Sequence, residues 1–169
     1  MKTSSLFAEK TVLSFEIFTP KRTDSPRTIY ETIAALKNLN PDFISVTYGA
    51  GGSGSNRGTM QIASTVKNIY NIESVAHLPC INLSRREVLV MLEQFRAAHI
   101  ENILALRGDM NPSFPPKHDF AHASDLVAFI KENGDFNVIG ACYPEGHPES
   151  ESIATTRSEE RRVGKECRS

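Results

Sequence analysis

The chain has 169 residues, 40% of them hydrophobic, and a formal net charge of −1. This length supports one domain with a hydrophobic core, and the near-neutral charge argues against the broad basic surface that nucleic acids and acidic membranes attract. The three cysteines are widely spaced and odd in number, which is typical of a reducing compartment. No apolar run has the length of a signal-peptide core or a membrane span. We therefore expect a cytoplasmic protein that binds neither nucleic acid nor membrane.

Apolar strand-like runs alternate with helical stripes along most of the chain. Five runs rich in β-branched and aromatic residues predict strands at residues 12–18, 43–48, 75–78, 102–106 and 138–143. Four stretches between them predict helices: one beginning at Ser25-Pro26, one carrying Ile62 and Val66, one with the capping-box spacing Ser84–Glu87, and residues 123–132 closed by a left-handed cap at Gly134. Such alternation predicts an α/β fold with parallel strands.

Polar or small residues stand at the end of every predicted strand, from Glu16 at the first to Tyr143 at the last. A (β/α)8 barrel gathers all its strand ends at one mouth, whereas an open doubly wound sheet concentrates its site at one switch point. The pattern favours the barrel. Because a complete barrel needs about 250 residues, we expect a partial, truncated TIM barrel of about five β/α units.

The chain is predicted to have three parts. Residues 1–10 are an N-terminal extension, and residues 11–152 form the partial-barrel catalytic domain. Residues 153–169 are highly charged with almost no apolar face, which predicts a disordered, non-native tail. A basic docking tail is the alternative.

The first predicted strand carries Glu16 near its carboxyl end. Both faces of this strand are mostly apolar, so we expect it to be covered on both sides and Glu16 to be buried. An isolated carboxylate is costly to bury unless it is paired, protonated or functional. Glu16, His77 and Asp109 together would suit a metal, but no close ligand pair supports one, and we predict no metal site.

The other candidates each have a structural alternative. The loop at 49–52 is a phosphate-binding nest or a flexible loop. His77 is a catalytic residue or a hydrogen-bonded core histidine. Arg107 and Asp109 hold a phosphate and tune a ring, or form a local ion pair, and Gly108 between them lets the backbone approach a flat ligand. Tyr143 and His147 contact a ring and an anion, or belong to a rigid turn.

Six segments, in this order, resemble the bacterial methylenetetrahydrofolate reductases: Ser14-Phe-Glu-Ile-Phe-Thr-Pro-Lys21, Asn40-Pro-Asp-Phe-Ile-Ser-Val-Thr-Tyr-Gly-Ala-Gly-Gly-Ser53, Ala76-His-Leu-Pro-Cys80, Asn102-Ile-Leu-Ala-Leu-Arg-Gly-Asp109, Ala123-Ser-Asp-Leu126 and Tyr143-Pro-Glu-Gly-His-Pro-Glu149. The resemblance implies a TIM barrel with FAD across the carboxyl ends of its strands. It implies an enzyme that passes hydride from NADH or NADPH to FAD and then to 5,10-methylenetetrahydrofolate, giving 5-methyltetrahydrofolate. Full-length members are expected to be homo-oligomers.

The resemblance also assigns roles to residues. Glu16 is implied as the general acid that opens the folate's five-membered ring, and Asp109 as the carboxylate beside flavin and pterin. The positions that match flavin contacts are Thr47, Tyr48, Ala50, Gly51, His77, Arg107, Gly108, Asp109, Ala123, Tyr143 and His147. His122 stands where the family often has tyrosine. Since the family's later strands have no counterpart here, a non-catalytic half-barrel with weak or no flavin binding is the alternative.

Overall fold

The computed structural model describes residues 1–20, 26–49, 57–110, 115–146 and 150–157. A five-stranded, all-parallel sheet forms its centre. The strands are β1 (Ser14–Ile17), β2 (Phe43–Val46), β3 (Glu73–Pro79), β4 (Asn102–Leu106) and β5 (Asn137–Gly140). The helices that connect them are α2 (Pro26–Lys37), α3 (Arg57–Asn68), α4 (Arg85–Ala97) and α5 (Ala123–Asn133). The predicted alternation of strands and helices is confirmed.

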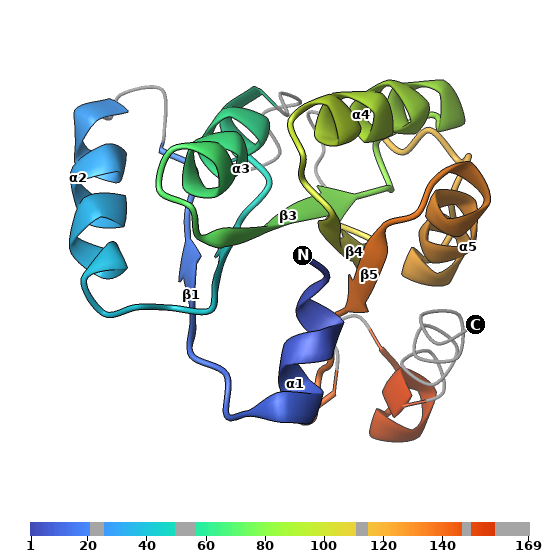
Figure 1. The fold of residues 1–169 in the computed structure, drawn as a ribbon. Helices are drawn as coiled ribbons and strands as arrows, with labels where there is room; N and C mark the ends of the chain where they lie inside the picture. The colour runs from blue at the N-terminus through green and yellow to red at the C-terminus, as the bar shows by residue number, and fades with distance from the viewer. Residues whose placement is uncertain (21–25, 50–56, 111–114, 147–149, 158–169) are drawn as a thin grey trace.

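The strand order decides between the two architectures. Neighbours in the sheet follow one another in the sequence, β1-β2-β3-β4-β5, so the order never reverses as it does in a doubly wound sheet. Right-handed crossovers that always step in one direction place every helix on the same face. Helices α2 to α5 accordingly form an arc around one side of the sheet (Figure 1). This is the arrangement of part of a (β/α)8 barrel, as predicted.

The hydrophobic core lies between the sheet and this arc. One row of side chains at matched register crosses all five strands on the helix-facing side, and every member is at most 7% exposed: Ile17, Val46, Ala76, Ile103 and Val138. The facing stripe of α4 repeats at helical spacing, with Val88, Leu92 and Phe95 all buried. Truncating Phe95 would leave a cavity at the centre of this layer, at a typical cost of about 4 kcal/mol.

Two helix ends test the capping structures that the sequence predicted. The predicted capping box of α4 is confirmed, because Ser84 Oγ accepts from the backbone N–H of Glu87 while the Glu87 carboxylate accepts from that of Ser84. The predicted left-handed cap after α5 is wrong. Gly134 has φ 173°, which is extended. Glycine is needed there for space, since a Cβ would lie 2.6 Å from the Phe136 ring.

The opposite, concave face of the sheet is only partly covered. The expectation that β1 is buried on both sides is wrong: Phe18 beside it is 73% exposed, and the Glu16 side chain is 48% exposed. Helices cover one face of the sheet, and side chains on the other face would be buried only by elements lying across the barrel interior.

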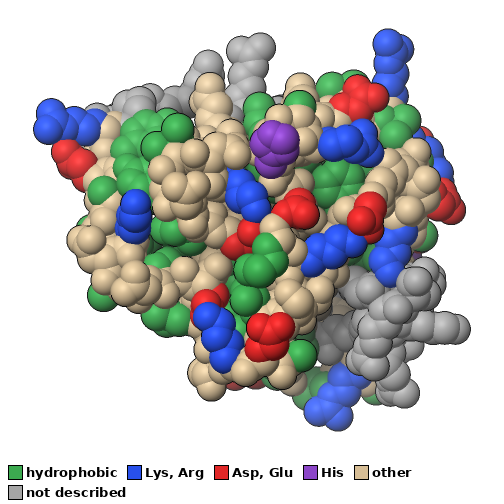
Figure 2. All heavy atoms as spheres, viewed as in Figure 1, with side chains coloured by type: hydrophobic (Ala, Val, Ile, Leu, Met, Phe, Trp, Pro, Cys, Tyr) green, Lys and Arg blue, Asp and Glu red, His purple; other side chains and the backbone are tan. Residues whose placement is uncertain are grey.

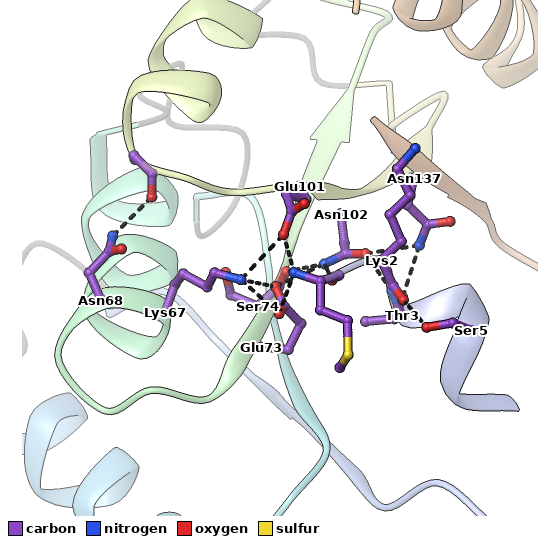
Figure 3. Close-up of polar contacts among 12 residues, drawn as sticks. Lys2, Thr3, Ser5, Lys67, Asn68, Glu73, Ser74, Glu101, Asn102 and Asn137 are labelled. Carbon is purple, nitrogen blue, oxygen red and sulfur yellow. Dashed lines mark hydrogen bonds and ion pairs between the residues drawn. The ribbon is translucent and has the colours of Figure 1, made fainter. Parts of the chain in front are cut away.

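Residues 1–10, expected as an extension, fold onto the concave side as η1 (Thr3–Ser5) and α1 (Leu6–Glu9) (Figure 1). The Phe7 and Phe43 rings meet edge to face with centroids 6.4 Å apart. At the amino ends of β3 and β4, Glu73 and Asn102 anchor a polar network that includes Thr3 and Lys67 (Figure 3). The amino edge of the sheet is thereby closed by internal contacts.

Candidate active site

Three side chains meet on the concave face near the carboxyl ends of the first three strands. Glu16 Oε2 lies 3.4 Å from His77 Nε2 and 3.4 Å from Ser45 Oγ. Glu16 and Ser45 are direct partners in the β1–β2 register, and His77 lies on β3. Parallel pairing thus converts residues far apart in the sequence into one cluster at the edge where barrel enzymes place their sites.

His77 is the buried member of this cluster, at 6% exposure. Burial lowers the pKa of its imidazole, and the nearby Glu16 carboxylate partly opposes that effect. Nε2 is shielded from solvent, and no described residue gives it a hydrogen bond of good geometry. His77 therefore lies in surroundings that disfavour the protonated ring, with one buried nitrogen 3.4 Å from the Glu16 carboxylate.

Thr47 ties the ends of β1 and β2 to helix α3. Its hydroxyl accepts from the backbone N–H of Thr19 at 3.1 Å, and its carbonyl accepts from the Thr59 hydroxyl at 2.8 Å. Thr59 and Thr19 are both buried. Thr47 is thus held in place from two sides, which makes its side chain a rigid part of the carboxyl edge.

The turn after β4 packs on the segment that follows β3. The Arg107 carbonyl accepts from the backbone N–H groups of Cys80 and Ile81, at 3.1 and 2.8 Å. Arg107 Nε in turn lies 3.3 Å from the Gly108 carbonyl oxygen. Asp109 follows on the exposed surface, and among the described residues no hydrogen bond or ion pair joins it to Glu16. The structure therefore brings His77 to Glu16, but not Asp109.

Gly108 is required by this packing, independently of any ligand. Its φ is +88°, and a Cβ would lie 2.9 Å from Pro79 Cβ and 3.3 Å from Ile81 Cγ2. We expect Gly108→Ala to lower the free energy of unfolding by about 3 kcal/mol, from backbone strain plus overpacking, as measured by urea denaturation. The control is Gly58→Ala, whose Cβ would meet only Thr19 at an ordinary 3.8 Å. An alanine at 108 as stable as the one at 58 would refute this explanation.

The remaining predicted positions have different surroundings. Tyr48 is half-buried against the core, and burial, with the Glu87 charge, raises the pKa of its phenol. Ala123 begins α5, where the Asp125 carboxylate accepts from the backbone N–H of His122. Tyr143 is 41% exposed after β5. Ala50, Gly51 and His147, also predicted to contact flavin, lie outside the described residues.

The loop between β4 and α5 contacts the start of α4 through an ion pair. Lys117 Nζ donates to both carboxylate oxygens of Glu87, at 2.5 and 2.7 Å. These bonds, with those from Ser84, lower the pKa of Glu87 to about 2. The pair is close to half exposed, with side chains at 45% and 44%, so water screens much of its energy.

This pair predicts a pH dependence of stability. Since the folded pKa of Glu87 lies below its ordinary 4.5, its contribution is present above that value and is lost as the pH falls from there toward 2. We expect Lys117→Met to lower the free energy of unfolding by about 1 kcal/mol at neutral pH, with a smaller difference near pH ~3, in urea titrations at both pH values. An equal loss at the two values would show that Lys117 acts through packing.

Among the described residues, no cluster of three or more histidine, cysteine, aspartate or glutamate side chains has the arrangement of a metal site. Cys80 is fully buried, and burial raises the pKa of its thiol to about 12, so it is not a reactive thiolate. No helix in the described ranges has the length and apolarity needed to cross a bilayer. On the face seen in Figure 2, acidic and basic side chains are interspersed.

Comparison with known proteins identifies the family. The sequence model described as methylenetetrahydrofolate reductase matches residues 2–161. The chain belongs to the methylenetetrahydrofolate reductase family. Relatives include the 5,10-methylenetetrahydrofolate reductase of Pectobacterium carotovorum, 41% identical over 140 residues, and that of Escherichia coli K12, 39% identical over 141. The Arabidopsis thaliana protein named methylenetetrahydrofolate reductase (NADH) 1 is 37% identical over 158 residues, which are 88% of this chain and 26% of that one.

The alignments cover most of this chain but only part of each relative. Each of the two bacterial alignments covers 83% of this chain and 46% of the relative, so the chain spans about half the length of those curated relatives. Among solved structures, 4-hydroxy-tetrahydrodipicolinate synthase from Methylacidiphilum fumariolicum SolV superposes with a TM-score of 0.58 at 13% identity, over 92% of this chain and 52% of that one. At this identity the likeness concerns the fold alone, and it agrees with the barrel arrangement.

Ser45 is the member of the Glu16–His77 cluster that sequence reasoning missed. It stands inside an apolar run, Phe-Ile-Ser-Val, with no motif of its own. The usable signal was strand alternation, which puts Ser45 on the same face as Thr47. Only the register shows that this face is the one that carries Glu16.

Proposed function

We propose that this chain carries part of the active site of a flavin-dependent reductase. The proposed reaction converts 5,10-methylenetetrahydrofolate to 5-methyltetrahydrofolate with NADH or NADPH as the hydride source. The observation that carries the proposal is the Glu16–His77–Ser45 cluster at the carboxyl edge of a barrel sheet, in a chain of this reductase family. The compartment is proposed to be the cytoplasm, and the complete protein to be a homo-oligomer.

The residues at this edge fit FAD. His77 Nε2 is a buried polar atom without a well-formed hydrogen bond among the described residues, and Thr47 is a rigid polar group on the neighbouring strand. When bound, FAD would accept hydride from the nicotinamide and deliver it to the folate. The residues proposed to hold it are Thr47, Tyr48, Ala50, Gly51, His77, Arg107, Gly108, Asp109, Ala123, Tyr143 and His147.

Glu16 is proposed as the general acid of the reaction. Opening the folate's five-membered ring requires a proton on the departing ring nitrogen, and a carboxyl group within reach of that nitrogen supplies it. Half of the Glu16 side chain is accessible, while Oε2 is already engaged by Ser45 and His77. Asp109 is proposed to lie beside the flavin and pterin, where its negative charge would disfavour an anionic reduced flavin.

A second candidate function follows from the exposed concave face. With Phe18 73% exposed and Glu16 48% exposed, the described residues leave one side of the proposed site uncovered. Within the part of the chain that the structure describes, the edge strands β1 and β5 each have one neighbour in the sheet, a feature that favours association with other chains. On this account the chain is a non-catalytic half-barrel that binds flavin weakly or not at all.

NADH oxidation that depends on the folate substrate distinguishes the two. The purified protein is incubated with FAD, NADH and 5,10-methylenetetrahydrofolate, and product is measured by mass spectrometry. The reductase proposal predicts 5-methyltetrahydrofolate in amounts that match the NADH consumed. A folded protein that consumes no NADH and forms no product, even at saturating FAD, would support the half-barrel account and contradict activity in this chain.

A further inference from the structure

We propose that Ser45 is a positioning residue for Glu16, which together with His77 fixes carboxylate oxygen Oε2 and leaves Oε1 available to the substrate. Only the meaning of this arrangement for catalysis rests on the proposed function. The contact itself can be tested without flavin or folate.

The backbone register makes Ser45 the side chain best placed for this task. Glu16 and Ser45 are direct partners across the β1–β2 pair, and neighbouring strands lie about 4.8 Å apart. A serine hydroxyl is short enough to reach the carboxylate across this gap without displacing it, and the Oγ–Oε2 distance is 3.4 Å. Alanine would offer no donor, and an acidic residue would repel the carboxylate.

The second contact to Glu16 Oε2 comes from His77 on β3. His77 Nε2 lies 3.4 Å from Glu16 Oε2 and is buried. Its register partner on β4 is Leu104, an apolar residue, and among the described residues Glu16 is the charged group that acts on His77. The Ser45 hydroxyl on β2 thus donates to Oε2, and the His77 ring on β3 lies against the same oxygen without a well-aligned hydrogen bond, while no described residue donates to Oε1.

Glu16 needs a residue that fixes its rotamer, because its side chain is exposed. A side chain that is 48% exposed retains several rotamers in water, and freezing it costs about 1 kcal/mol or more of conformational entropy. Packing alone does not fix this carboxylate. Ser45 supplies a directional contact that favours the rotamer lying against His77, so that Oε1 takes a defined position in front of the sheet.

NMR titration of the His77 ring in four variants tests this role. The Glu16 charge raises the pKa of His77 against the effect of burial, so Glu16→Gln should lower that pKa. If Ser45 holds the carboxylate against the ring, Ser45→Ala should produce most of the same decrease. Ser45→Thr, which keeps a hydroxyl, should restore the original value. Ser14→Ala, an exposed serine two residues before Glu16 on the same strand, is the matched control and should change nothing.

The outcomes separate this inference from the proposed function. An unchanged His77 pKa in Glu16→Gln or in Ser45→Ala, or a failure of Ser45→Thr to restore it, would overturn the positioning role. In protein that reduces the folate, Ser45→Ala should also lower kcat about tenfold with an unchanged KM for NADH. If the NMR shifts occur as expected but no folate is reduced by any variant, the positioning role holds and the reductase proposal fails.

Discussion

Replacing Asn102 by leucine is expected to lower the free energy of unfolding by about 4 kcal/mol. Asn102 is fully buried. Its Oδ1 accepts from the Thr3 backbone N–H at 2.8 Å and from Asn137 Nδ2 at 2.9 Å, and its Nδ2 lies 3.2 Å from both Glu73 Oε1 and the Ser74 carbonyl. Leucine has a similar branched shape, although it is larger, and would leave several of these groups buried without partners, each at a cost of about 1–3 kcal/mol.

Urea denaturation of the variant measures this loss, and Asn133→Leu is its control. Asn133 donates a single side-chain bond, to the Phe129 carbonyl at 2.8 Å, from a half-buried position. Its replacement should cost about 1 kcal/mol. If the two leucine variants were equally stable, the network at the amino ends of β3 and β4 would not be a main support of the sheet.

Replacing Glu16 by glutamine is expected to reduce the rate of folate reduction about 1,000-fold, because the amide retains the shape of the side chain but has no acidic proton to give. NADH oxidation with an artificial electron acceptor should continue at close to the original rate, because hydride transfer to flavin requires no proton from Glu16. Steady-state rates are measured in the same preparation with the folate and with the artificial acceptor. The comparison separates folate reduction from hydride transfer between NADH and flavin.

Ser14→Ala serves as the control for this substitution, since it alters the same strand two residues away. An equal loss in both half-reactions of Glu16→Gln would indicate damage to the flavin site. An unchanged folate rate would remove Glu16 from the proposed mechanism.

Much of the fold was predictable because its signals are local. The predicted strand at residues 102–106 has the bounds of β4, and the capping box at Ser84 marks the start of α4. The start of β3 was missed because Glu73 and Ser74 are polar. The Glu73 carboxylate enters the sheet because Lys67 donates to both its oxygens at 2.7 Å, a contact that strand periodicity does not encode.

The candidate site was predictable only in part, for a related reason. Side-chain alternation placed Glu16 on one face of β1, but whether that face is covered depends on elements far from it in sequence, and the expected burial is wrong. Ser45 and its contact with Glu16 depend on the register of two strands 29 residues apart. The packing requirement for Gly108 comes from Pro79 and Ile81, which no local sequence pattern indicated. Pairings of this kind are non-local and emerge only when the sheet is assembled.

Titration of the folded protein with FAD, followed by quenching of flavin fluorescence, tests the central claim most directly. The carboxyl edge is proposed as a flavin site, so saturable binding with one FAD per chain is expected, and His77→Ala should weaken it about tenfold. Asn133→Ala, on the far end of α5, should bind as the original does. Absence of saturable FAD binding by folded protein, or equal affinity in His77→Ala, would contradict the account.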